Sequence, residues 1–370
     1  MMRRILLVSF LALTLIACGT NNAALDNDQT PRSRYTGDVG ESPVGVIPEG
    51  SLRDAARNRD VGVAVEYPTR PGPHPLIIFS HGFGATAREY VGLASFWASQ
   101  GYVVIRPTHA DAGRGNTARA AQDAWATQGA ADWAARVQDV RFVIDSLDQL
   151  EQRYPELQGK IDRTRIGVGG HSYGAMTAML IGGGRTFPGG TAYADPRVRA
   201  VVAMGPPGPG PSRGLTEESF AQLTKPVLFI VGTREMGVGE TETPAWRRRA
   251  FELAPAGDKW LVTLEGGGFS AYTGRMEPVQ ADRRPDDSPI IDDPTDPTRN
   301  PVAPPVVRPA QDPRRPGRET ATGLRTRGAF ATVKALSLAF WDSYLRDNNT
   351  EARTALEAAG TRGGVTLEKK

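Results

Sequence analysis

Short continuous runs of apolar residues alternate along the chain with longer segments in which apolar residues recur at helical spacing. The segments predicted to be strands lie at 76–79, 102–105, 166–170, 198–204, 227–231 and 260–264; most of their residues are apolar, and an alternating segment spans 61–67. The segments of helical spacing lie at 86–100, 131–150, 175–181 and 329–345. Runs without a polar face are typical of strands that are buried on both sides. The pattern therefore predicts an α/β fold with a mostly parallel central sheet, covered by helices on both faces.

The first 17 residues are predicted to be an export signal. Arg3 and Arg4 precede an apolar run at 5–16, which is too short to span a bilayer core of about 30 Å. Residues 15–19 (Leu-Ile-Ala-Cys-Gly) then resemble the lipobox of bacterial lipoproteins, which implies cleavage after residue 17 and lipidation of Cys18. A plain signal peptide with a stray cysteine, or an uncleaved anchor, is the alternative. Because Gly19 is not acidic, we expect the outer membrane rather than the inner one as the destination.

The composition of the rest of the chain changes between three kinds of segment: a polar tether, the α/β domain and a proline-rich insertion. Residues 18–49 are polar without an apolar period and predict a flexible tether, so the α/β domain is expected over 50–370. A segment at about 275–324 holds eleven prolines, a density that prevents helices and central strands. We interpret it as a solvated insertion, with a lid as the alternative.

Charge and cysteine content exclude several classes of function. The 44 basic and 41 acidic side chains give a net charge of +3, which is too balanced for a general nucleic-acid binder. A single cysteine excludes an intrachain disulfide and a cysteine-rich metal site. No metal site and no cofactor are expected.

One motif carries the expected chemistry. Residues 170–174 (Gly-His-Ser-Tyr-Gly) follow a predicted strand and precede a predicted helix, which is the context of a nucleophile elbow. The turn presents the hydroxyl of Ser172 above the sheet and places the N–H of Tyr173 beside it. His171 is expected to lie beneath the elbow and to point away from it.

A second motif supports the first. Residues 80–84 (Ser-His-Gly-Phe-Gly) end an earlier buried strand, where a hydrolase needs a second donor for an oxyanion. The N–H of Phe83 is the candidate, and His81 is expected to be a packing residue of this loop.

These residues carry a family resemblance. The chain resembles an α/β-hydrolase of the predicted dienelactone hydrolase-like group, and it is similar to platelet-activating-factor acetylhydrolases, from about residue 51 to about residue 345 without the proline-rich insertion. The resemblance rests on 79–82 (Phe-Ser-His-Gly), 98–104, the elbow and 339–342 (Ala-Phe-Trp-Asp). It implies ester hydrolysis through an acyl-serine, with a triad in the order Ser, acid, His.

The chain departs from that pattern at two positions. Where the family pattern has Gly-Thr-x-Asp, this chain has Gly-Thr-Arg-Glu, so Glu235 takes the acid position. Where the family has the histidine, this chain has Phe269. The four histidines are His74, His81, His109 and His171, and none follows Ser172. The expected general base is therefore absent from the chain.

Two substitutes for the base are open. His109 follows the strand at 102–105 on the same edge of the predicted sheet, although that strand is expected two spacings from the serine strand. A partner chain or the substrate is the other source.

Two functions follow. The first is a membrane-anchored serine esterase that acts on short-acyl or lipid-like esters with an atypical triad. The second is an inactive lipoprotein of the same fold that binds a ligand or partner.

Overall fold

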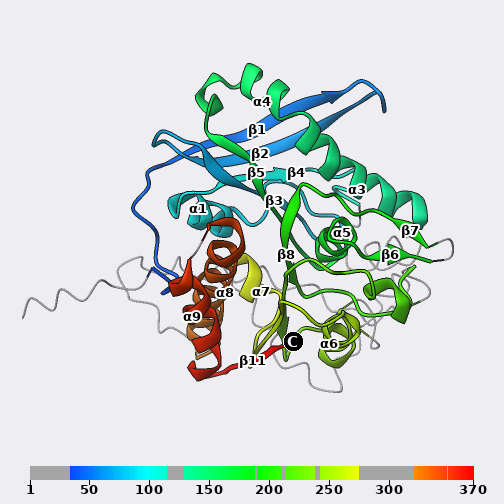
Figure 1. The fold of residues 1–370 in the computed structure, drawn as a ribbon, viewed down its shortest axis with the longest axis vertical. Helices are drawn as coiled ribbons and strands as arrows, with labels where there is room; N and C mark the ends of the chain where they lie inside the picture. The colour runs from blue at the N-terminus through cyan, green and yellow to red at the C-terminus, as the bar shows by residue number, and fades with distance from the viewer. Residues whose placement is uncertain are drawn as a thin grey trace, which may run out of the picture. The chain divides into compact units, whose positions relative to one another are not determined.

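A nine-stranded sheet runs through the described part of the chain (Figure 1). Its order is β1-β2-β4-β3-β5-β8-β9-β10-β11. Neighbouring strands from β4 to β10 are parallel, whereas β1, β2 and β11 pair antiparallel at the two ends. The expectation of a mostly parallel sheet is confirmed. The bounds are β1 Val44–Asp54, β2 Arg59–Pro68, β3 His74–Ser80, β4 Val103–Pro107, β5 Ile161–His171, β8 Val198–Met204, β9 Val227–Gly232, β10 Lys259–Leu264 and β11 Val365–Lys369.

The structure is a computed structural model, and it describes residues 34–114, 129–187, 190–210, 214–237, 242–274, 321–347 and 349–370. Residues Arg34–Lys370 form one unit. The expected signal, Cys18, the first part of the tether and the proline-rich insertion up to residue 320 lie outside the described residues. Among the described helices, none is both long enough and apolar enough to cross a membrane.

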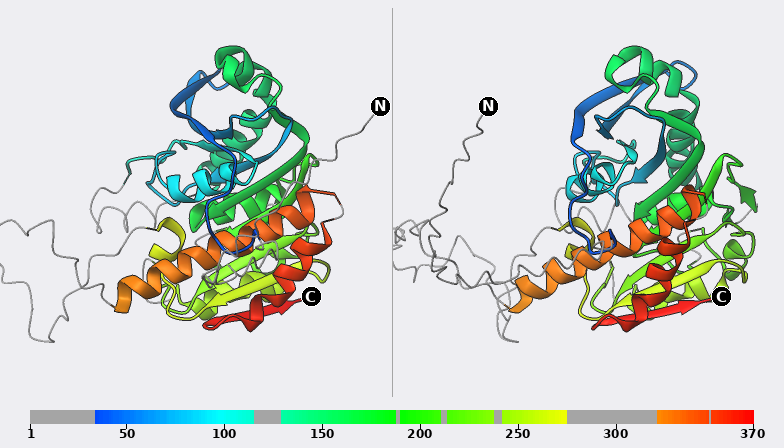
Figure 2. Two further views of the ribbon diagram at one scale, coloured as in Figure 1. Left: turned by 90° about the vertical axis from the view of Figure 1, so that its left-hand side faces the viewer. Right: turned by 60° about the vertical axis from the view of Figure 1, so that its left-hand side comes forward.

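Helices cover both faces of the sheet. The bounds are α1 Val91–Ser99, α3 Ala130–Asp145, α4 Leu147–Arg153, α5 Tyr173–Ile181, α6 Pro244–Leu253, α7 Ser270–Thr273, α8 Ala321–Leu345 and α9 Thr350–Glu357. Helices α3, α5 and α6 contribute to one hydrophobic cluster, and α1, α7, α8 and α9 contribute to the other. Figure 2 shows α8 and α9, in orange and red, lying together against the sheet. A short ribbon of β6 (Arg185–Thr186) and β7 (Thr191–Ala192) lies outside the main sheet.

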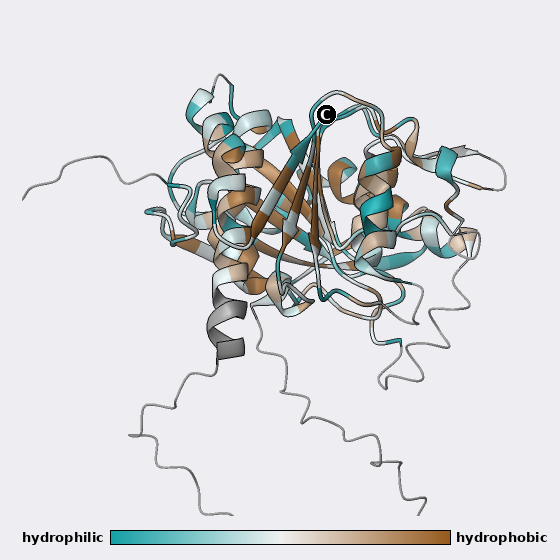
Figure 3. Ribbon diagram, turned by 90° about the horizontal axis from the view of Figure 1, so that it is seen from below, coloured by the Kyte–Doolittle hydropathy of each residue, from teal (hydrophilic) through white to brown (hydrophobic). Residues whose placement is uncertain are grey.

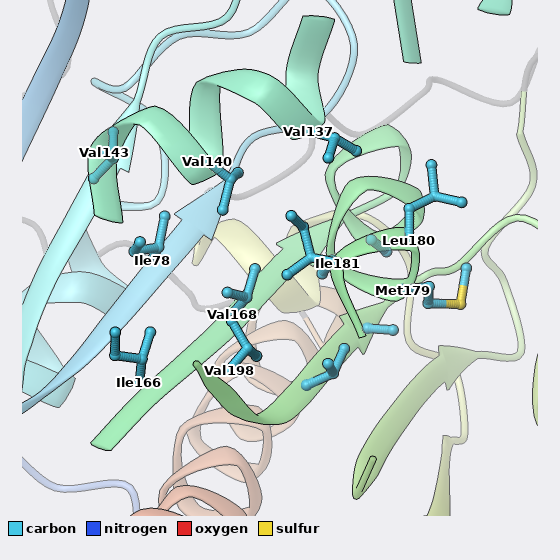
Figure 4. Packing of buried hydrophobic residues seen from close by; sticks show 14 of the residues in the cluster. Ile78, Val137, Val140, Val143, Ile166, Val168, Met179, Leu180, Ile181 and Val198 are labelled. Atoms are coloured by element: carbon cyan, nitrogen blue, oxygen red, sulfur yellow. The ribbon is translucent and has the colours of Figure 1, made fainter. Parts of the chain in front are cut away.

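Alternation along the strands divides the core into these two clusters. Ile78 and Val201 belong to the cluster under α3 and α5, while their neighbours Ile77 and Val202 belong to the cluster under α8. Figure 4 shows Ile78 and Val168 packed between residues of α3 and α5, and Figure 3 shows the apolar strands in the interior. Both faces of the central strands are therefore buried, which explains why they appear as continuous apolar runs.

Several predicted elements have different limits in the structure. The expected helix at 131–150 is interrupted at Ser146, and the expected helix at 86–100 is shorter, since α1 starts at Val91. Strands β1 and β11 were not predicted. Both lie at an edge of the sheet and have exposed positions, so they lack the apolar run of a central strand.

The boundary of the predicted tether is wrong. Residues 34–49 belong to the folded unit, and β1 begins at Val44. Tyr35 is 2% exposed and donates a hydrogen bond to Asp342 at 3.0 Å. Because that partner lies about 300 residues away in the sequence, local composition could not show that this segment is ordered.

Candidate active site

Ser172 lies at the sharp turn between β5 and α5. Its φ of 54° and ψ of −116° place it in a sparsely populated backbone region, which costs on the order of 1–3 kcal/mol. The Ser172 N–H donates to the carbonyl of Met204 at 2.8 Å and ties the turn to β8. A Cβ added to Gly170 would lie 2.2 Å from the Gly174 carbonyl oxygen, and one added to Gly174 would lie 2.0 Å from the Ser80 carbonyl oxygen. A side chain at either position would clash with the backbone, so both positions require glycine.

Ser172 lines a cavity of about 300 Å³. The walls are mostly apolar, and the lining residues include Phe83, Tyr90, His171, Arg247 and Phe269. Hollows of about 540 and 570 Å³ occur elsewhere on the described surface, but Ser172 lines neither. The cavity thus brings together the expected nucleophile, one expected oxyanion residue and the position expected to hold the base.

Glu235 follows β9 and is fully buried. Its Oε2 accepts hydrogen bonds from the Tyr272 hydroxyl at 2.7 Å and from the Gly232 N–H at 3.3 Å. Burial alone raises the pKa of Glu235, but His171 and the charge of Arg247 lower it by more, so the net pKa is below its ordinary value. The carboxylate is therefore ionised at neutral pH.

Three buried polar atoms meet beside this carboxylate. Glu235 Oε1 lies 3.8 Å from His171 Nε2 and 3.7 Å from Arg247 Nε. These distances are too long for hydrogen bonds, and each of the three atoms lacks a hydrogen-bond partner among the described residues. Buried polar groups are normally paired. The second oxygen of the acid therefore lies beside one charged group and one imidazole, and no described donor is within hydrogen-bond distance of it.

Phe269 lies after β10, directly before α7, and its ring faces the polar group around Glu235. The ring centroid is 4.9 Å from that of His171 in an edge arrangement, and the Arg247 guanidinium lies 5.8 Å from it. An apolar ring therefore occupies the region of the cavity in which the family resemblance implied a histidine.

His171 was expected to point away from the elbow, but the structure places it on the same cavity as Ser172. Its ring lines the cavity, where Nδ1 is 2.7 Å from the Tyr90 hydroxyl and Nε2 faces Glu235. Burial lowers the pKa of His171, and the Arg247 charge lowers it further against the opposing effect of Glu235. The ring is therefore neutral at pH 7, and its two nitrogens face Tyr90 and Glu235 rather than Ser172. The elbow motif alone did not indicate this orientation, because the strand beneath it could present His171 to either side.

The structure places His109 in a different cluster. Its Nε2 is 2.8 Å from Ser80 Oγ and its Nδ1 is 2.9 Å from Asp139 Oδ2, and all three residues are buried. Burial and the charge of Arg136 lower the pKa of His109. Because both ring nitrogens are occupied, this geometry does not support His109 as a substitute base for Ser172. Its strand, β4, is separated from β5 by β3, as expected.

The two expected oxyanion residues lie close together. Phe83 follows β3, and Tyr173 is the first residue of α5. Their rings meet edge to face with centroids 6.0 Å apart. The structure thus brings both loops to the carboxyl end of the parallel strands.

Sequence analysis missed Arg247, Tyr90 and Tyr272. Arg247 is 2% exposed and donates to the Gly205 carbonyl at 2.7 Å. In the sequence it belongs to a run of three arginines, which is typical of a solvated helix face, so the local signal was misleading. Within the described residues, no group of three or more His, Cys, Asp and Glu could hold a metal ion.

Comparisons with known proteins agree with this fold. A model of the alpha/beta hydrolase family matches residues 77–344, which is most of the chain. Platelet-activating factor acetylhydrolase from Cavia porcellus is 25% identical over 190 residues, a match that covers 42% of this chain. The chain spans 39% of that relative's length. The range matched by the family model contains the whole candidate site, from Phe83 to Phe269.

Proposed function

The chain belongs to the alpha/beta hydrolase family, and we propose that it is a serine ester hydrolase for short-acyl or lipid-like carboxylic esters. The observation that carries the proposal is Ser172, held at a strained turn with its side chain at a cavity of about 300 Å³. A strained turn at this place exposes a hydroxyl to a bound substrate.

The proposed reaction proceeds through an acyl-serine. Ser172 Oγ forms a bond to the ester carbonyl carbon, and the carbonyl electron pair moves to the oxygen, which accepts hydrogen bonds from the N–H groups of Phe83 and Tyr173. The ester C–O bond then breaks, and the alcohol leaves with a proton. Water attacks the acyl-serine and releases the acid, which restores the hydroxyl.

The missing base limits the rate of this reaction. Phe269 cannot accept the serine proton, and no hydrogen bond joins a histidine to Ser172 in the described structure. Loss of a triad member costs on the order of 10⁴–10⁶ in kcat and leaves about 10³–10⁴ over water. We therefore propose slow turnover, with the proton passing to water.

The cavity favours small acyl groups. Its volume of about 300 Å³ is at the lower end of the range for ligand sites, and its walls include Phe83, Tyr90 and Phe269. The relative named above is an acetylhydrolase, and an acetyl group is a short acyl group. An ester with a short acyl chain fits both observations.

A second candidate is an inactive binding protein of the same fold. It is favoured by the contact between Phe269 and His171, since an aromatic ring fills the place of the base while the cavity persists.

In either case, we propose export and lipid anchoring through Cys18, which rests on the sequence alone. Cys18→Ser should release the protein into the soluble fraction or block its processing, and unchanged membrane attachment would contradict the anchor.

Turnover of p-nitrophenyl acetate and butyrate by the parent and by Ser172→Ala distinguishes the two functions. We expect slow hydrolysis in the parent that falls at least ten-fold in the variant. Equal rates in both proteins would reject the esterase and favour the binding protein. Stoichiometric labelling of Ser172 by a fluorophosphonate at neutral pH would instead show that a base already activates it.

A further inference from the structure

A buried arginine joins the two loops that carry the proposed oxyanion donors. Arg136 of α3 is 2% exposed, and its Nη1 donates to the His81 carbonyl at 2.7 Å while its Nη2 donates to the Gly82 carbonyl at 3.2 Å. Its guanidinium also lies 4.2 Å from the centre of the Tyr173 ring. One side chain therefore contacts both the loop after β3 and the first residue of α5.

We propose that Arg136 is a positioning residue that orients the Phe83 N–H as an oxyanion donor, an inference that rests on the proposed ester hydrolase function. The peptide between Gly82 and Phe83 is trans, so its N–H points opposite to its carbonyl. Arg136 draws the Gly82 carbonyl toward α3. The Phe83 N–H consequently faces away from α3, and both Gly82 and Phe83 line the cavity that holds Ser172.

A neighbouring histidine holds the same carbonyl. The His109 N–H donates to His81 Nε2 at 3.1 Å, so this nitrogen is the acceptor of a neutral ring. The proton is then on Nδ1, which donates to the Gly82 carbonyl at 2.7 Å. Burial and the charge of Arg136 lower the pKa of His81, so the ring is neutral at pH 7. Two donors thus hold one peptide in one orientation.

Asp111 fixes the arginine itself. Arg136 Nε and Nη2 donate to the two Asp111 oxygens at 2.9 and 2.7 Å, a bidentate pair that lysine cannot reproduce. Asp111 also accepts from the Gly84 N–H at 3.1 Å, so the acid holds the far end of the same loop. The buried pair is therefore placed to fix the loop geometry on which the N–H direction depends.

The first test reads the orientation without any catalysis. The full chain is labelled with [¹⁵N]phenylalanine, and Phe83→Leu assigns one of its 12 phenylalanine amide signals. Arg136→Gln combined with Asp111→Asn removes the clamp without leaving a buried charge unpaired. Arg141→Gln is the matched control, because Arg141 also lies on α3 and donates to the Tyr193 and Ala194 carbonyls at 2.8 and 2.9 Å.

We expect the Phe83 amide signal to move and its exchange rate with solvent to change at least ten-fold in the double variant, because the N–H no longer faces the cavity, and both to stay at the parent values in Arg141→Gln. An unchanged signal and exchange rate at Phe83 in the double variant would overturn the proposal. If the double variant does not fold, Arg136→Lys decides: a signal and exchange rate that differ from the parent support the clamp, and the parent values reject it.

The second test measures hydrolysis of p-nitrophenyl acetate above the Ser172→Ala background. Removing one oxyanion donor costs on the order of 10²–10³ in kcat, so we expect a misdirected donor to lower kcat about 10- to 100-fold with KM within two-fold. A rise in KM at constant kcat would contradict a role in orienting the oxyanion donor. If Ser172→Ala is as fast as the parent, the ester hydrolase proposal fails, and the amide exchange still decides the role of Arg136.

Discussion

Two polar clusters in this protein each have one feature of a catalytic site that the other lacks. Ser80, His109 and Asp139 form a complete hydrogen-bonded series with contacts of 2.8 and 2.9 Å, but all three are buried. At the candidate site, Ser172 lines a cavity, but the position expected to supply the base holds Phe269. The first cluster has the bonding of a catalytic triad without access, and the second has access without the base.

The comparison shows that the order Ser-His-Asp does not by itself make an active site. Ser80 ends a strand in ordinary extended backbone, whereas Ser172 occupies a strained turn with φ of 54°. Asp139 also accepts from Arg57 at 2.7 Å and from Arg59 at 3.0 Å, so the buried cluster has the partners of a structural network. A serine nucleophile needs both access to the substrate and an adjacent base, and neither cluster has both.

The largest expected effect comes from supplying the missing base. Phe269→His places an imidazole in the cavity beside Glu235 and Ser172, and general base catalysis contributes about 10²–10⁴. We expect kcat/KM for p-nitrophenyl butyrate to rise by about that factor. A carboxylate displaced by about 1 Å can cost about 10²-fold, so adding Glu235→Asp tests whether the longer acid limits the gain.

The control for this gain is Phe269→Leu, which removes the ring without adding a base. Ser172→Ala in the histidine background should abolish the gained activity. If Phe269→His is no faster than Phe269→Leu, Phe269 does not occupy the base position.

A smaller effect is expected from breaking the buried cluster. Asp139→Ala leaves His109, Arg57 and Arg59 without their common acceptor. Loss of one partner from a buried ion pair costs on the order of 3–5 kcal/mol. Because both arginines are partly exposed, we expect a loss of about 3 kcal/mol. Urea unfolding measures this loss as a lower free energy of unfolding.

The matched control is Asp148→Ala, which removes an exposed ion pair with Arg163 and should cost less than about 1 kcal/mol. Equal losses of unfolding free energy in the two variants would show that Asp139 contributes no more to stability than an exposed acid does.

The smallest effect is a difference in pH dependence. Burial lowers the pKa of both His109 and His171 below the ordinary 6.5. Below pH 6.5 the unfolded chain binds more protons at these residues than the folded chain, so stability rises with pH and is lost as pH falls. Each histidine that stays neutral contributes a slope of about 1.4 kcal/mol per pH unit in that range.

Urea unfolding of the parent, His109→Gln and His171→Gln at pH 5, 6 and 7 checks this sign. We expect each single variant to reduce the slope between pH 5 and 6, by at most the equivalent of one proton, about 1.4 kcal/mol per pH unit. A slope that stays at the parent value in His171→Gln would mean that this histidine is protonated in the folded protein, unlike His109.

The strands and the elbow could be predicted because they depend on local sequence. Burial on both faces produces a mostly apolar segment such as Val198–Met204, which matches β8 at both ends although its second residue, Arg199, is exposed. The glycines at 170 and 174 mark a turn without room for a Cβ. The edge strands β1 and β11, the burial of Tyr35 and the break at Ser146 depend on neighbours distant in the sequence, so no local pattern revealed them.

The sequence by itself determined the α/β fold class, the position of Ser172 and the lack of any histidine after it. Apolar segments and glycine-flanked turns are patterns of neighbouring residues, and the positions of the histidines are given directly by the sequence. Only the tertiary structure decided where the polar side chains are used. It directed His109 to Asp139, turned His171 toward Glu235, and buried Arg136 against the loop of Phe83. A buried charge or imidazole must find partners wherever the fold brings them, and those partners lie on elements that are far apart in the chain.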